Sequence, residues 1–176
     1  MVRRRIATVS GDDPVVEQDG DDDEGRQWHR RFAIELFNRS WDLLEQPDRS
    51  PDDDAEMLAA AFGSAYHWGR VGTAENRALA DHQISKVASH VGQPALALHY
   101  ARRALEAIEI GRFGNWQVAA AYEGMARACA AAGDAAGRDY WVQRCTIALG
   151  AVPDAADRSV VAEQLLNVPH PPPQEE

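Results

Sequence analysis

Apolar residues recur at intervals of three and four along the chain from residue 28 to residue 166. This spacing places them on one face of an α-helix, whereas a half-buried strand would need strict alternation. No alternating stretch of useful length is found anywhere in the chain. The period is clearest at Trp28, Phe32, Ala33, Leu36, Phe37, Trp41 and Leu44. We therefore predict an all-α fold.

Residues with special backbone preferences divide this region into about seven helices. Pro47 ends the first helix, and Ser50 followed by Pro51 starts the second with a serine cap and a proline in the first turn. Thr73 and Asn76 form a capping-box pattern that opens the third helix. Later boundaries fall at Gly92, Pro94, Gly111, Gly114, Gly133 and Pro153. Because the connections are short, we expect consecutive helices to pair as antiparallel hairpins.

The net charge of −10 is concentrated at the two ends of the 176-residue chain. Residues 1–25 hold three arginines against eight acidic residues, and two more glutamates end the chain, so residues 26–174 carry only −3. This balanced region lacks the basic footprint of a nucleic-acid-binding protein. No apolar run approaches the ~20 residues that cross a bilayer. We therefore expect neither a nucleic-acid partner nor a membrane protein.

The ends of the chain also differ from the helical region in composition. Residues 1–25 contain few apolar side chains and the acidic run 19–25, which predicts a disordered arm because too little surface can be buried to offset the ordering entropy. Residues 168–176 contain three consecutive prolines, which predict an extended, disordered tail. A single helical domain is expected at residues 26–167.

The two helices that flank Gly92 carry a regular set of apolar and small residues. The set comprises Ile84, Ala88, Gly92, Ala97, Ala101, Ala104 and Leu105. It is similar to the signature of the tetratricopeptide repeat, in which small side chains let the second helix lie close to the first and a glycine supplies the left-handed turn. The hairpin around Gly133 repeats the first-helix part of this pattern.

The resemblance implies a short tetratricopeptide-like solenoid in which the last helix covers the exposed end of the stack. Residues 66–72, 82–85 and 120–127 also resemble stretches of an uncharacterised bacterial group within that superfamily. This second resemblance supports the fold and implies no activity.

In tetratricopeptide folds, the first helices of the hairpins line a groove that binds peptides or partner segments. Carried over residue by residue, the resemblance places five polar residues in such a groove: His82, Lys86, His90, Glu123 and Arg127. The basic-and-asparagine clamp for a C-terminal carboxylate is not reproduced, because asparagine is absent at the matching positions and Glu123 would repel an anion. The resemblance thus implies a mixed polar groove for a protein or peptide.

A second candidate site is an aromatic and histidine cluster near the end of the second helix. Its members are Tyr66, His67, Trp68, Arg70, Asn76 and Arg77. Aromatic rings with one polar edge suit a partly wet ligand pocket. The same spacing is also typical of core packing, and the polar members could instead satisfy helix ends. No His-x3-His or Glu-x2-His pair is present, so we expect no metal site and no cofactor.

We expect a non-catalytic protein- or peptide-binding module, with a small-molecule- or metal-binding domain centred on residues 66–82 as the alternative. The sequence contains no glycine-rich phosphate loop, and its spacing places no general base beside Cys129 or Cys145. Nothing in it therefore indicates catalysis. Arginine greatly outnumbers lysine and alanine is abundant, which suggests a high-GC bacterial genome and a reducing cytoplasm. Homo-oligomerisation through an exposed end of the stack is a further interpretation.

Overall fold

The computed structural model describes residues 17–171, and every regular element within them is an α-helix. The helices are α1 (Glu17–Glu45), α2 (Pro51–Val71), α3 (Ala74–His90), α4 (Pro94–Gly111), α5 (Asn115–Ala131), α6 (Ala135–Leu149) and α7 (Ala155–Leu166). The all-α prediction and the expected number of helices are confirmed for this part of the chain.

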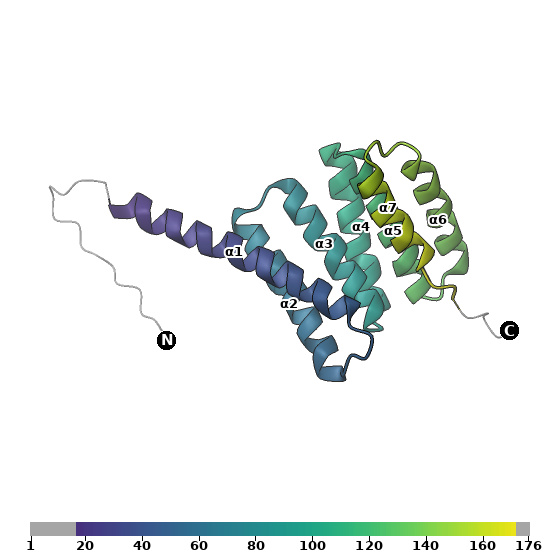
Figure 1. Cartoon of the computed structure of the whole chain (residues 1–176), viewed down its shortest axis with the longest axis horizontal. Helices are drawn as coiled ribbons and strands as arrows, with labels where there is room; N and C mark the ends of the chain where they lie inside the picture. Colours follow the sequence, from purple (N-terminus) through teal and green to yellow (C-terminus); the bar gives the residue numbers. More distant parts are fainter. Residues whose placement is uncertain (1–16, 172–176) are drawn as a thin grey trace.

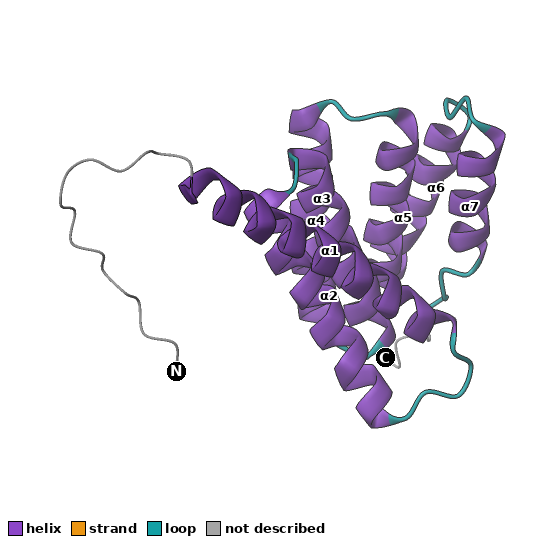
Figure 2. Cartoon of the chain, turned by 60° about the vertical axis from the view of Figure 1, so that its left-hand side comes forward, coloured by secondary structure: helices purple, strands orange, loops and turns teal. Residues whose placement is uncertain are grey.

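The described helices pair in sequence order into the hairpins α1–α2, α3–α4 and α5–α6, which stack side by side (Figure 1). The backbones of the first helices also approach one another closely, α1 to α3 and α3 to α5, whereas α2 and α4 meet through long side chains such as Phe62 and Tyr100, whose rings lie 5.6 Å apart. The first helices therefore form the inner layer of the stack. The C-terminal helix α7 packs on α5 and α6 (Figure 2).

The residues that predicted the helix boundaries act as expected. Ser50 and Thr73 each accept a hydrogen bond from the backbone three residues later, and each capping box is closed by a return bond from the N-cap residue. Gly92 and Gly133 have φ angles of 68° and 76°, the left-handed conformation that the turns of the second and third hairpins require. Three alanines of α4 that were expected to allow close packing are almost fully buried: Ala97, Ala101 and Ala104.

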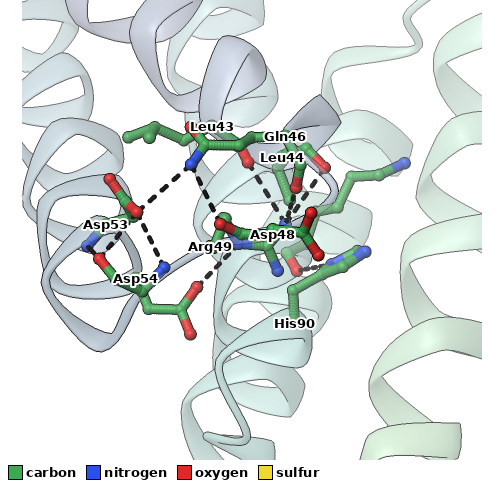
Figure 3. Close-up of polar contacts among 10 residues, drawn as sticks. Leu43, Leu44, Gln46, Asp48, Arg49, Asp53, Asp54 and His90 are labelled. Carbon is green, nitrogen blue, oxygen red and sulfur yellow. Dashed lines mark hydrogen bonds and ion pairs between the residues drawn. The ribbon is translucent and has the colours of Figure 1, made fainter.

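Arg49 fixes the connection between α1 and α2 (Figure 3). Its guanidinium donates hydrogen bonds to the main-chain carbonyls that end α1, those of Leu43, Leu44 and Gln46. It also pairs with Asp54 in the first turn of α2 at 2.8 Å. A cation suits this place because the last carbonyls of a helix have no partner within the helix.

Both predicted disordered ends need correction at their inner boundaries. The helix α1 begins at Glu17, inside the predicted arm at 1–25, and side-chain bonds from Gln27 to Asp23 and from Trp28 to Glu24 support its N-terminal half. The predicted tail at 168–176 begins with Val168, which is buried against Ala126 and Ala130 of α5. The rest of the two segments, residues 1–16 and 172–176, lies outside the described residues.

Candidate functional site

A cleft lies on the inner face of the stack between α1 and α7, with residues of α3 and α5 as its floor. It contains a cavity of about 220 Å3. The lining residues are Phe37, Trp41, Leu79, His82, Gln83, Trp116, Ala120, Asp157, Val160, Val161 and Gln164. The cleft exists because the first helices meet in one layer and α7 returns across α5.

The walls of the cleft are mainly aromatic and aliphatic. Phe37 and Trp41 lie about one turn apart on α1, and Trp116 lies in the first turn of α5. Each of these three rings is half-buried, so part of its surface stays open. Val160 and Val161 complete the wall on α7. Walls of this kind favour an apolar group, because binding removes apolar surface from water on both sides.

Gln83 forms part of the floor and ties α3 to α1. Its Nε2 donates hydrogen bonds to the carbonyl of Phe37 at 3.0 Å and to the hydroxyl of Ser40 at 2.6 Å. Its Oε1 is buried and has no hydrogen-bond partner among the described residues. The Gln83 amide therefore holds the Phe37 side of the cleft in place through its nitrogen, while its acceptor oxygen remains unsatisfied.

His82 lies beside Gln83 in the floor and is 8% exposed. Burial lowers the pKa of its imidazole to about 4, so the ring is neutral at pH 7 and carries one donor and one acceptor nitrogen. Position 124 of α5 must be glycine for this arrangement, because a Cβ there would lie 2.8 Å from His82 Nδ1. The imidazole thus fills the close contact between α3 and α5.

Lys86, Glu123 and Arg127 form a buried ion cluster next to the cleft. Glu123 Oε1 lies 2.6 Å from Arg127 Nη2 and 3.6 Å from Lys86 Nζ. Burial raises the pKa of the Glu123 carboxyl, but the two cations outweigh burial and leave it below its ordinary value. Burial lowers the pKa of Lys86 to about 8. Lys86 Nζ also lies 5.1 Å from the centre of the Trp41 ring, which joins the cluster to the cleft wall.

Arg127 also holds the end of α7. It donates hydrogen bonds to the carbonyls of Gln164 at 2.8 Å and of Asn167 at 3.2 Å. These carbonyls belong to the C-terminal turn of α7, where a cation is favourable. Glu123 orients the same guanidinium through a second bond at 2.8 Å. The ion cluster therefore positions one wall of the cleft.

The five residues expected in an open polar groove come together, but they do not line an open groove. Of the five, only His82 lines the cleft cavity. Lys86, Glu123 and Arg127 are buried beneath α7 and Trp41. His90 is exposed at the end of α3, where its Nδ1 lies 2.8 Å from the Lys86 carbonyl and its ring lies near Arg49 (Figure 3). The physical reason is α7, which covers part of the face that the sequence assigned to solvent.

The aromatic and histidine cluster expected near the end of the second helix is divided among several places. Trp68 is buried against Ala33 and Ala80, and Asn76 closes the capping box with Thr73. The remaining members face solvent, α1 or the preceding turn: Tyr66 and Arg70 are exposed, His67 contacts His29 with 2.7 Å between their Nδ1 atoms, and Arg77 donates to the Gly72 carbonyl. A smaller cavity of about 170 Å3 is lined by Trp68 and Asn76 but by none of the other four.

Sequence reasoning did not identify the aromatic walls as a site. Phe37 and Trp41 belong to the apolar stripe of the first helix, and helical spacing alone does not separate ring surface that faces a cleft from ring surface that packs in the core. Residues 17–171 contain no group of three histidine, cysteine or acidic side chains that could hold a metal. Cys129 and Cys145 are free and buried, and burial raises the pKa of Cys145 to about 12.

Comparison with known proteins yields no relative: no family model, no curated protein and no solved structure matches the chain. The fold and the site therefore define its class, an all-α stack of helical hairpins with an aromatic cleft on the inner face. None of the helices described here combines the length and apolar character that a bilayer crossing requires.

Proposed function

We propose that the protein is a non-catalytic, protein- or peptide-binding module, and that the cleft between α1 and α7 receives an anchor side chain of the partner. The observation that carries this proposal is the cleft itself: three half-buried aromatic rings around a cavity on the inner face of a helical-hairpin stack. The resemblance of the α3–α4 hairpin to a tetratricopeptide repeat supports it, because such stacks bind partner segments on this face.

The size of the cavity favours an anchor over a whole small molecule. Sites for small molecules and cofactors usually measure ~300–1,000 Å3. The cleft cavity measures about 220 Å3. A partner that inserts one large side chain and spreads the rest of its contact over α1 and α7 fits this volume. Interfaces of this kind draw most of their affinity from a few such anchors.

The chemistry of the cleft favours a neutral anchor with an apolar body. The charges near the cleft nearly cancel, because Lys86 and Arg127 lie beside Glu123 and Asp157 lies at the rim, so an arginine or lysine gains no net attraction. A carboxylate would lose hydration between aromatic walls and meet Asp157 at the rim. His82 lines the cavity and is neutral at pH 7, so it adds no charge that would favour a carboxylate. We therefore propose an aromatic or long aliphatic side chain as the anchor.

Binding can be tested with a pair of variants on α7. Val160 is 54% exposed and lines the cavity, whereas Leu166 on the same helix is 85% exposed and does not line it. Peptides selected from a displayed random library on the wild-type protein should carry a shared apolar anchor residue. Val160→Arg should weaken their affinity at least about tenfold, because the new side chain blocks the cavity. Leu166→Arg should leave the affinity unchanged.

The affinities are measured by titration calorimetry, with circular dichroism to establish that both variants are folded. Selected peptides that bind Val160→Arg as well as the wild type would contradict the proposed cleft. A library that yields no binder to the wild type would contradict the peptide-binding function.

A further inference from the structure

The N-terminal half of α1 projects beyond the hairpins and is not covered by another helix (Figure 1). Large apolar side chains are open to solvent where it leaves the stack: Trp28 is 46% exposed, Phe32 41% and Tyr66 of α2 61%. Trp28 stacks on Phe32 at 5.8 Å, Phe32 contacts His67 at 5.4 Å, and His67 contacts Tyr66 at 5.3 Å. We call these four residues the α1 patch.

The charged residues beside the α1 patch are complementary to the same residues of a second copy of the chain. Glu24 precedes Trp28 by about one turn and Arg31 follows it by three residues, so both lie on the side of α1 that carries Trp28 and Phe32, whereas Asp23 and Arg30 lie on the opposite side. When two such helices run antiparallel and cross near Trp28, Glu24 of each copy faces Arg31 of the other. Parallel helices would bring like charges together. The pattern therefore selects one relative orientation.

The other helices make few stabilising contacts with the N-terminal half of α1. Arg31 pairs with Glu35 at 2.6 Å and lies over the Trp28 ring at 5.5 Å, so both of these contacts are within α1. The segment contains Gly25 and several aspartates, which are poor helix formers away from the first turn. Helices of this composition gain most of their stability from an apolar face packed against a neighbour. The α1 patch is that apolar face, and its rings stay partly open to solvent among residues 17–171.

We propose that a second copy of this chain docks on the α1 patch, with the two α1 helices antiparallel and a two-fold axis near Trp28. Trp28 and Phe32 of the two copies form the apolar centre, and Glu24 of each copy pairs with Arg31 of the other across the axis. Such a contact is isologous, so it closes as a dimer and leaves no free copy of the same surface. The cleft between α1 and α7 is not part of this interface, so the dimer does not depend on the proposed function.

Charge-swap variants test the pairing. In Arg31→Glu the two charges that flank Trp28 on this face are both acidic, and in Glu24→Arg both are basic. Sedimentation velocity between about 1 and 500 μM at low salt should show a monomer–dimer equilibrium for the wild type. Each variant alone should dimerise at least about tenfold more weakly, because like charges meet. An equimolar mixture should recover association close to that of the wild type.

Two further variants test whether the apolar centre drives dimerisation or whether removing any exposed ring weakens it. Trp28→Ser/Phe32→Ser should also weaken dimerisation at least about tenfold, because it removes the centre of the interface. Tyr140→Ser, which removes a ring that is 53% exposed on α6, should have no effect. A wild-type chain that stays monomeric over the whole concentration range would overturn the proposal. Charge variants that dimerise like the wild type, or a mixture that stays monomeric, would overturn the antiparallel pairing.

Discussion

The side chain of Glu123 makes a large contribution to the stability of this protein. It is fully buried and is the acidic partner of both Lys86 and Arg127. We predict that Glu123→Gln lowers the free energy of unfolding by about 3–5 kcal/mol, because two buried cations lose their counter-charge. Urea unfolding followed by tryptophan fluorescence measures the change. The matched control is Glu56→Gln, which breaks the exposed pair with Arg39 and should shift the unfolding midpoint little.

Removing the buried cation Lys86 should not destabilise the protein in this way. Lys86→Met leaves the pair of Glu123 and Arg127 intact, and it replaces a buried charge by an apolar side chain of similar length. We therefore expect its free energy of unfolding to stay within about 1 kcal/mol of the wild type or to rise. A loss as large as that of Glu123→Gln would contradict this account of the cluster.

His82 should make the stability of the protein depend on pH. Its pKa is about 4 in the folded protein and about 6.5 in an unfolded chain. Between these values the unfolded chain binds a proton that the folded protein does not, so stability falls as the pH is lowered through this range. The contribution is about 3 kcal/mol. Urea unfolding of the wild type and of His82→Gln at pH 7 and pH 4 measures it, and equal losses would contradict the prediction.

At the level of the elements, the contacts at the C-terminal end of α7 fix it to the stack more than the contacts along the rest of the helix. Its only buried residue is Val161, while Arg127 binds the last carbonyls and Val168 packs on α5 just beyond the helix. We predict that Val168→Ala lowers the free energy of unfolding by about 1–2 kcal/mol. Val160→Ala, the same change at an exposed position, is the control and should cost much less. Equal effects in thermal unfolding would contradict this anchoring.

The boundaries of the elements could be predicted because they depend on local chemistry. Ser50 and Thr73 cap the helices that they were expected to cap, and Gly92 adopts the left-handed turn. The first boundary was wrong because the acidic run before Arg26 reads as disorder from its composition, although acidic residues are also favourable in the first turns of a helix. The role of Val168 could not be predicted, since one apolar residue before a proline-rich stretch has no periodicity.

At the level of the whole molecule, the stack decides which helical faces meet. The faces of α3 and α5 that carry His82, Lys86, Glu123 and Arg127 were assigned correctly to one side. Their burial depends on α7, which returns across that side after the third hairpin. The aromatic cleft arises in the same way, because its walls come from α1, α5 and α7, which are distant in sequence.

The sequence by itself determined that the chain is helical, where most of its helices begin and end, and that α3 and α4 pack closely through small residues. These properties depend on interactions within a few turns, which the order of residues specifies directly. Only the tertiary structure decided that the polar face is covered, that a cleft remains between α1 and α7, and that the first half of α1 stands free. Those properties depend on contacts between helices far apart in the chain, and residue spacing within one helix does not encode them.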